Sequence, residues 1–327
     1  MGEAEKRDGE QPALHDVAIL GGGAAGYAAA IYAGRARLST LLVDGMGGGG
    51  QLNVIDQIEN YPGFPEPISG PDLQEAMRKQ AERFGVAVTF DQIEKVEPWE
   101  GGVTLAGAYG SYRARALLVA TGAHHRELGV PGEERLKGRG VSYCATCDGN
   151  FFKDQRVVVV GGGDTAVKDA IYLSRLVRKL TLIHRRDKLR AEKVMQEKLL
   201  SLPNVEPRWD SVVEEVRGEG KVTGVRLKHV KTGAPSELEA DGVFVFIGVL
   251  PNTALLRGVV ELDPAGYVKT DVGMRTSHPH IFAAGDVRSR SVKQIAAAVG
   301  DGVTAMLNIQ ELLDSETPPR ELPVVRS

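Results

Sequence analysis

The stretch DVAILGGGAAG, residues 16–26, decides the fold. Its first five residues are mostly apolar and predict a buried strand. Gly21, Gly23 and Gly26 follow with the spacing Gly-x-Gly-x-x-Gly, and the alanine-rich residues 27–36 predict a helix. A strand, a glycine turn of this spacing and a helix are together typical of a Rossmann-like dinucleotide-binding unit.

Each part of this turn has a physical task. Gly21 permits the tight turn, Gly23 lets a pyrophosphate approach the backbone, and Gly26 lets the helix pack close to the strand. The free N–H groups and the dipole at the start of the helix, near Ala24, favour an anion. The next predicted strand ends at Asp44, 23 residues after Gly21, where an acid binds ribose hydroxyls. The alternative is a glycine-rich turn without a ligand.

The same pattern recurs in the middle of the chain. RVVVV, residues 156–160, predicts a second buried strand, and GGGDTA, residues 161–166, is a second turn that ends in Ala166 instead of glycine. The strand after the following helix ends in basic residues, namely His184, Arg185 and Arg186, with Arg190 just beyond. A guanidinium binds a 2′-phosphate, which a carboxylate would repel. The first unit therefore predicts a site for a dinucleotide with a free ribose and the second a site for NADPH, with a solvated basic face as the alternative for the second.

Two further strand ends support a flavin. LLVATGA, residues 117–123, ends in Ala-Thr-Gly and suits a crossing between domains. IFAAGDV, residues 281–287, ends in Gly-Asp before a predicted helix, residues 294–313, and Asp286 could hold a ribityl hydroxyl there. The first unit is therefore expected to continue beyond the second.

The predicted fold class is α/β, with two Rossmann-like dinucleotide-binding domains of three ββα layers, the second inserted into the first. We expect residues 1–125 and 251–327 to form the FAD-binding domain, with 1–14 disordered. Residues 126–250 are expected to form the NADPH-binding domain.

Composition limits the function classes. The net charge of −3 and the pI near 6.2 argue against nucleic acid or a membrane surface as partner. No apolar run approaches the roughly 18 residues of a membrane span, and the charged N-terminal residues lack a hydrophobic signal core. We therefore expect a cytoplasmic protein, in which a cysteine pair is not a structural staple.

The chain has two cysteines, Cys144 and Cys147, and Asp148 follows them directly. Their spacing also suits a zinc site, but a closed site needs four ligands and the chain has no second Cys-x-x-Cys. His124 and His125 lie about 20 residues upstream, beyond a predicted turn. A module that only senses NADPH would have no reason to keep both cysteines and the acid.

Over about residues 15–315 the chain resembles the low-molecular-weight, bacterial-type thioredoxin reductases. The matching stretches are GGGAAGYAAAIYAGRA, GGGGQLNVIDQIENYPGF, ATGA, GRGVSYCATCDG, GGGDTAV, HRRDKLRAEK, IGVLPNT and AAGDV. The CATCDG stretch is highly specific for this family. Its position just before the second nucleotide domain separates the family from larger disulfide reductases, which carry their pair near the first glycine turn.

The resemblance implies roles for the residues of the reaction. Cys147 would lie against the flavin, Cys144 would attack the disulfide of thioredoxin, and Asp148 would act as acid and base. This agrees with thiol chemistry, because only a thiolate attacks a disulfide and a neighbouring group must handle protons. Arg139 and Phe151 would meet thioredoxin, although Phe151 could equally be a core aromatic.

The resemblance also assigns the cofactor contacts and an assembly. FAD contacts are expected at Gly21, Gly23, Ala24, Gly26, Asp44, Gly50, Gln51, Leu52, Asn60, Ala120, Thr121, Gly122, Asp286, Val287, Gln294 and Ile295. NADPH contacts are expected at Gly161, Gly163, Asp164, Thr165, His184, Arg185, Arg186 and Arg190. A homodimer is implied, as is rotation of the NADPH domain about hinges near residues 123–126 and 248–252, since one flavin cannot face both nicotinamide and cysteines.

A related flavoenzyme is the main alternative function. It would take electrons from a ferredoxin-type donor, or pass them to another disulfide protein. The His184-Arg185-Arg186 cluster argues for NADPH, and no appended N-terminal redox domain of the alkyl hydroperoxide reductase flavoprotein is expected. Asn150 and Lys293 depart from the family pattern and put partner choice and rates in doubt, not the reaction class.

Overall fold

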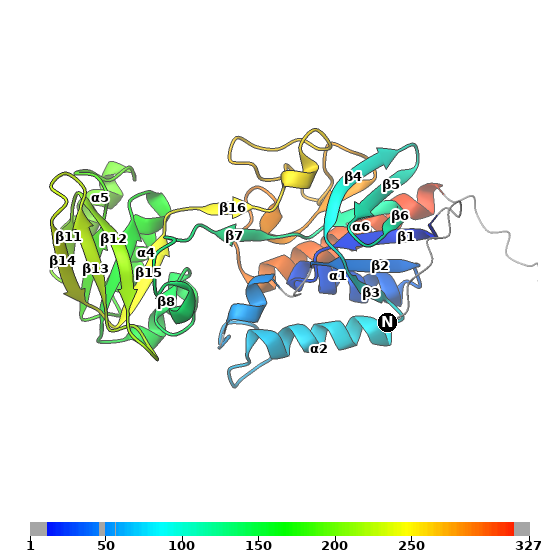
Figure 1. The fold of residues 1–327 in the computed structure, drawn as a ribbon. Helices are drawn as coiled ribbons and strands as arrows, with labels where there is room; N and C mark the ends of the chain where they lie inside the picture. Colours follow the sequence, from blue (N-terminus) through cyan, green and yellow to red (C-terminus); the bar gives the residue numbers. More distant parts are fainter. Residues whose placement is uncertain (1–11, 46–49, 56, 317–327) are drawn as a thin grey trace, which may run out of the picture.

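The strand predicted at residues 16–20 is β1, Leu14–Leu20, in a computed structural model that describes residues 12–45, 50–55 and 57–316. Leu14 belongs to this strand, so the expectation of disorder up to residue 14 is wrong there; residues 1–11 lie outside the described part. Figure 1 shows the described residues as two lobes joined by a thin ribbon. This arrangement confirms the predicted α/β fold class.

The first lobe is built on a sheet with the order β3-β2-β1-β6-β5-β4, in which β17 also pairs with β6. Its strands are β1, β2 (Thr40–Asp44), β3 (Ala87–Phe90), β4 (Ile93–Trp99), β5 (Gly102–Gly107), β6 (Ser111–Val119) and β17 (Ile281–Ala283). The long β6 pairs with antiparallel β5 along its first half and with parallel β17 along its second half. Thus a strand from residues 281–283 completes a sheet begun by residues 14–20.

Helices cover one face of this sheet: α1 (Ala24–Arg35), α2 (Gly70–Arg83) and α6 (Ile295–Glu316). The small side chains of α1, such as Ala29 and Ala33, let α6 pack closely through Ala305 and Met306. The opposite face packs in a second cluster, with Leu105 of β5 and Leu256 of the short helix η4, Ala254–Leu256. A further short helix, η1 (Gly50–Val54), precedes α2.

The second lobe has a wholly parallel sheet with the order β11-β10-β9-β15-β8. These strands are β8 (Val141–Ser142), β9 (Arg156–Gly161), β10 (Lys179–Ile183), β11 (Val205–Arg208) and β15 (Gly242–Phe246). One face packs against α4 (Asp164–Ser174) and α5 (Lys193–Leu200). The other packs against an antiparallel sheet of β12 (Ser211–Arg217), β13 (Gly224–His229) and β14 (Pro235–Glu239), which gives three ββα layers.

The ribbon between the lobes consists of β7 (Ala123–His125) and β16 (Val249–Pro251), paired antiparallel. Both strands thus fall where the sequence predicts the domain joins. In the second lobe the chain first forms the short helix η2 (Glu134–Leu136). The cysteine segment follows β8 and contains α3 (Ala145–Asp148) and η3 (Gly149–Phe152).

The stretch at residues 281–287 differs from its prediction as one strand. The strand stops at Ala283, and Gly285–Val287 form a short helix, η5. Gly285 has φ of +76°, and a Cβ there would lie 3.1 Å from Cβ of Ala25. The chain turns here because glycine alone adopts this conformation without strain, close to α1.

Candidate functional site

The carboxyl ends of β2, β1, β6 and β17 meet at one edge of the first sheet, since these strands run parallel. The first glycine turn lies at this edge. Gly21 has φ of +111°, and a Cβ there would lie 2.5 Å from the carbonyl oxygen of Ala120. A Cβ on Gly26 would lie 1.9 Å from the carbonyl oxygen of Gly21. Only glycine therefore permits this packing of turn, helix and β6.

Asp44 ends β2 beside this turn and is 6% exposed. Its Oδ1 accepts hydrogen bonds from the backbone N–H groups of Gly22 and Gly45, both at 2.9 Å. At Gly23, by contrast, an added Cβ would meet nothing within 4 Å. The turn is thus held from one side by a buried carboxylate and is open beside Gly23.

The remaining strand ends carry predicted flavin contacts. Ala120 is buried, and Thr121 and Gly122 follow it as part of a network with Asn252. Asp286 accepts a hydrogen bond from the Ser291 hydroxyl at 3.0 Å, and Val287 is fully buried. Burial raises the pKa of Asp286, while the Ser291 hydrogen bond and Lys293 oppose that rise.

Two loops bring more predicted contacts to the same edge. Gln51 Nε2 donates to the carbonyl oxygen of Ala123, the first residue of the ribbon. Asn60 Nδ2 donates to Gln294 Oε1 at 3.2 Å, just before Ile295 begins α6. Gly50 begins η1 with φ of +52°, and the neighbouring Leu52 is buried in the core. Segments 234 residues apart therefore meet here.

The second glycine turn follows β9 in the same manner. Gly161 has φ of +158°, and a Cβ there would lie 2.6 Å from Cβ of Ala166. His184 ends the neighbouring β10 region, is 5% exposed, and lies under Gly162, where an added Cβ would be 2.3 Å from its ring. Burial lowers the pKa of His184. His184 therefore supports the turn from beneath.

The charged residues of this second turn face solvent. Arg185, Arg186 and Arg190 are exposed, as are Asp164 and Thr165 at the start of α4. Asp164 Oδ1 accepts from the Glu192 backbone N–H at 2.9 Å, and Arg190 N–H donates to the Gly162 carbonyl at 2.7 Å. The guanidinium of Arg190 lies 4.0 Å from the position of a Cβ on Gly163. An anion over Gly163 would thus be within reach of a guanidinium.

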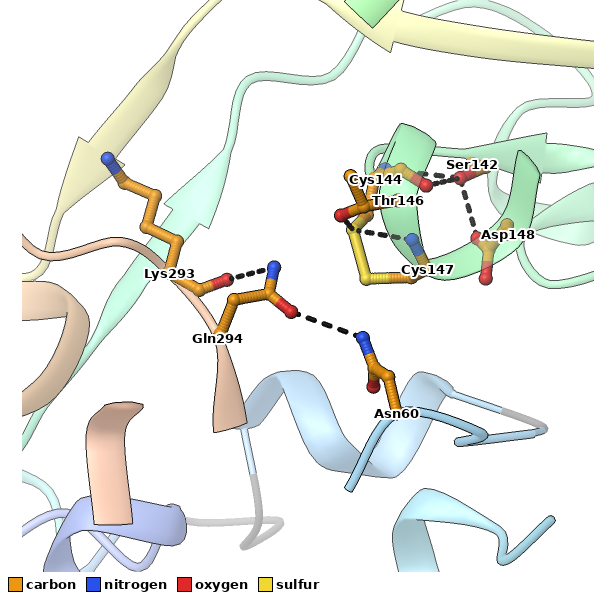
Figure 2. The surroundings of a disulfide bond; sticks show 8 residues. All are labelled: Asn60, Ser142, Cys144, Thr146, Cys147, Asp148, Lys293 and Gln294. Carbon is orange, nitrogen blue, oxygen red and sulfur yellow. Dashed lines mark hydrogen bonds between the residues drawn. A yellow bond between two sulfur atoms is a disulfide. The ribbon is translucent and has the colours of Figure 1, made fainter. Parts of the chain in front are cut away.

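Cys144 and Cys147 form a disulfide in which the two Cα atoms are 5.3 Å apart. Cys144 precedes α3, and its sulfur accepts a hydrogen bond from the Cys147 backbone N–H at 3.2 Å. Both cysteines are half-buried. Figure 2 shows the disulfide with Asn60, Lys293 and Gln294 of the first lobe in its surroundings. The two sulfurs are thus bonded to each other in this structure.

The acid after the pair is held in place by a residue that the sequence analysis missed. The Ser142 hydroxyl donates to Asp148 Oδ2 at 2.6 Å and accepts from the Cys144 backbone N–H at 3.1 Å (Figure 2). Ser142 is 4% exposed. One hydroxyl thus connects the cysteine and the acid. Its position two residues before Cys144 gave no signal, because serine is common near turns.

A family model described as pyridine nucleotide-disulphide oxidoreductase matches residues 15–302. The chain belongs to this family. Membership in this family implies a flavin and a pyridine nucleotide as cofactors. The two glycine turns and the disulfide are the features that this chemistry requires.

Individual relatives narrow the family. The thioredoxin reductase of Treponema pallidum is 48% identical over 89% of this chain and 94% of its own length. The crystal structure of thioredoxin reductase from Streptococcus pyogenes superposes with a TM-score of 0.89 at 44% identity, over 93% of this chain and all of that one. The resemblance to thioredoxin reductases is thereby confirmed.

A third relative has a similar sequence but superposes less well. The Lactococcus lactis thioredoxin reductase, in its FR conformation, is 40% identical over 92% of this chain and 99% of its own. Its TM-score is 0.63. Two relatives of nearly equal identity and coverage thus differ strongly in how well they superpose on this chain.

The residues of both turns fit the implied cofactors. The backbone at Gly23, beside buried Asp44, is open, as the approach of a pyrophosphate to the first turn requires. At the second turn, His184 Nε2 is buried without a hydrogen-bond partner among the described residues. The open face at Gly163 beside Arg190 suits a phosphate.

The predicted partner contacts lie on the surface of the second lobe. Phe151 is 40% exposed, which disfavours the core-aromatic alternative, and Arg139 is exposed in the turn before β8. Within the described ranges, no helix has the length and apolar character needed to cross a membrane.

Proposed function

We propose that this chain is an NADPH-dependent thioredoxin-disulfide reductase that uses FAD and the Cys144–Cys147 pair. The observation that carries the proposal is the position of the disulfide, half-buried and beside Asn60 and Gln294 of the first lobe. A redox pair in this place can receive electrons from the first turn's cofactor and still be reached by a protein. The relatives named thioredoxin reductase support thioredoxin over another disulfide protein as acceptor.

FAD would bind at the first glycine turn and NADPH at the second. Asp44 and Asp286 would hold hydroxyl groups of FAD, and the open backbone at Gly23 would receive its pyrophosphate. Arg185, Arg186 and Arg190 would hold the 2′-phosphate that distinguishes NADPH from NADH. Bound FAD would supply a two-electron carrier between nicotinamide and disulfide.

The cysteines then perform the exchange. When the pair is reduced, the Cys144 thiolate attacks one sulfur of the thioredoxin disulfide, and the other thioredoxin sulfur leaves as a thiolate. The Cys147 thiolate next attacks Cys144, which releases the second thioredoxin thiolate and restores the Cys144–Cys147 disulfide. The pair has thus given two electrons, and the two thioredoxin thiolates take up protons. The Cys147 N–H, 3.2 Å from the Cys144 sulfur, would stabilise a thiolate there.

Asp148 would handle the protons of the pair. Ser142 orients this carboxylate by the 2.6 Å hydrogen bond from its hydroxyl, and it also fixes the Cys144 backbone. The Asp148 carboxylate and the Cys144 backbone both bond to the Ser142 hydroxyl. Their relative position would therefore be preserved when the loop moves.

We further infer that the lobes rotate about the ribbon during turnover. The FAD-binding domain would comprise residues 1–125 and 251–327, and the NADPH-binding domain 126–250. The difference between TM-scores of 0.89 and 0.63 for relatives of similar identity supports two arrangements of the lobes. Arg139 and Phe151 would contact thioredoxin, and a cytoplasmic homodimer agrees with the family resemblance.

The test is NADPH-driven reduction of thioredoxin by the purified flavoprotein. We expect activity with NADPH, weak activity with NADH, and none after Cys144→Ser. If the flavin is bleached by NADPH while thioredoxin stays oxidised, the acceptor is wrong. If NADPH leaves the flavin oxidised, the donor is wrong, and a ferredoxin-type donor should then be tried.

A further inference from the structure

Tyr143 stands directly before Cys144 and contacts two different parts of the chain. Its ring stacks on His125, with ring centroids 5.3 Å apart and planes inclined by 23°. Its hydroxyl donates to Glu133 Oε1 at 2.8 Å. One side chain next to the reactive cysteine therefore contacts both the ribbon and the segment that follows it.

Glu133 anchors the hydroxyl end of this contact. It is 2% exposed, and its carboxylate also accepts from the backbone N–H groups of Leu128 and Gly129, at 2.8 and 2.7 Å. A buried carboxylate with three donors is well satisfied and holds its neighbours firmly. Burial and this carboxylate raise the pKa of Tyr143, so the hydroxyl keeps the proton that it donates.

His125 connects the ring end to the first lobe. It is the last residue of β7, and it is half-buried. Burial and the nearby charge of Lys293 lower its pKa to about 4, so the ring that Tyr143 contacts is neutral at pH 7. His125 thus interacts electrostatically with Lys293 of the first lobe and stacks on Tyr143 of the second.

Hydrogen bonds hold the ribbon to the first lobe at more than one place. Gln51 bonds to the Ala123 carbonyl, and His124 Nδ1 lies 2.7 Å from Asn252 Oδ1. The Tyr267 hydroxyl donates to the Val249 carbonyl of β16 at 3.4 Å. Because the ribbon is held to the first lobe, the contact of His125 with Tyr143 also holds the second lobe relative to the first.

We propose that Tyr143 is a positioning residue, which holds the redox loop (residues 142–148) in its present orientation toward the first lobe by stacking on His125. The Glu133 hydrogen bond fixes the loop within the second lobe, whereas the stack fixes the second lobe on the ribbon. Loss of the stack favours the other arrangement of the lobes. This inference rests on the proposed function, in which the lobes rotate.

The test measures lobe orientation directly. Azide-bearing amino acids replace exposed Tyr109 of the first lobe and exposed Val194 of the second, and two dyes are attached without modifying the cysteines. The labelled flavoprotein is mixed with an excess of unlabelled protein, so that a dimer carries dyes on one subunit alone. Single-molecule energy transfer between the two dyes then gives the ratio of the two lobe orientations. Circular dichroism and flavin content show whether each variant is folded.

His125→Ala and Tyr143→Ala should each shift this ratio away from the present orientation by about two- to tenfold, the effect of one aromatic pair. His125→Phe and Tyr143→Phe keep a ring and should stay near the wild type. The double alanine variant should shift no further than either single variant.

Three results would overturn the inference. These are an unchanged ratio in both alanine variants, equal shifts in His125→Ala and His125→Phe, or full additivity in the double variant. If Tyr143→Ala does not fold, the comparison of His125→Ala with His125→Phe decides. If the variants shift the ratio as expected but the wild type reduces no thioredoxin, the proposed function is refuted and the role of Tyr143 stands.

Discussion

The Ser142 hydroxyl lies 2.6 Å from Asp148 Oδ2 and 3.1 Å from the backbone nitrogen of Cys144. Cysteine and carboxylate, four residues apart in sequence, are thereby held by one buried oxygen. In the proposed mechanism Asp148 would handle the protons of the pair from this position, because proton transfer requires hydrogen-bond geometry.

Ser142→Ala should therefore lower the rate of thioredoxin reduction by about tenfold, the loss of one hydrogen bond to a charged group. Stopped-flow absorbance and a steady-state thioredoxin assay measure this rate. Ser142→Thr keeps the hydroxyl and serves as the control. Full activity of the alanine variant would show that Asp148 is positioned without Ser142.

Gly23→Ala separates cofactor binding from folding. An added Cβ meets no protein atom within 4 Å, so we expect the free energy of unfolding of the cofactor-free protein to change by less than about 0.5 kcal/mol. The same Cβ would occupy the approach of a pyrophosphate, so FAD should bind at least about tenfold more weakly. Fluorescence titration with FAD measures this affinity, and Gly220→Ala, also free of contacts, is the matched control. Unchanged affinity would place the pyrophosphate elsewhere.

Replacement of both Arg185 and Arg186 by alanine should raise KM for NADPH by at least about tenfold, since even one charge-assisted hydrogen bond contributes roughly 1.5–3 kcal/mol. KM for NADH should change little. Initial rates with each nucleotide measure the effect, and exposed Arg175→Ala controls for general loss of charge. An equal rise in both KM values would mean that these arginines do not bind the 2′-phosphate.

The low pKa of His125, about 4 against 6.5 for a free histidine, predicts a pH dependence of stability. Between these two values the unfolded chain binds a proton at His125 and the folded chain does not, so stability falls as pH decreases from about 6.5 toward 4. At higher pH the contribution is constant.

His125→Phe lacks this proton and keeps the ring. Its free energy of unfolding should therefore exceed that of the wild type increasingly as pH falls through this window. Urea unfolding at pH 7, 6 and 5 measures the difference, and His15→Phe, which replaces a half-buried histidine of β1 in contact with the Ser39 hydroxyl, is the control. A difference independent of pH would show that His125 is not buried as a neutral ring.

Local patterns were sufficient for much of the fold and for the glycine turns. The spacing of Gly21, Gly23 and Gly26 specifies a strand-turn-helix unit because Gly21 and Gly26 avoid close contacts with the neighbouring strand and with the turn itself, while Gly23 leaves the backbone open. The repetition of this unit and the return of the chain at residues 281–287 predicted an inserted second lobe, as the pairing of β17 with β6 shows.

The supporting contacts of the site could not be predicted in this way. Asn60 meets Gln294 across 234 residues, and Thr121 exchanges hydrogen bonds with Asn252 across 131. Glu133 and Tyr143 look like ordinary residues of a loop, yet burial makes one a satisfied anchor and the other a link to His125. No local pattern specifies such pairs, because a polar side chain finds its partner only after packing excludes water.

The sequence by itself determined the two nucleotide turns, the cysteine pair with its acid and the basic end of β10, since all of these depend on residue type and short spacing. Only the tertiary structure decided which first-lobe residues surround the disulfide and how the ribbon contacts the redox loop. Those relations arise from the docking of two independently packed sheets through one thin ribbon, and that geometry is set by contacts between residues far apart in the chain.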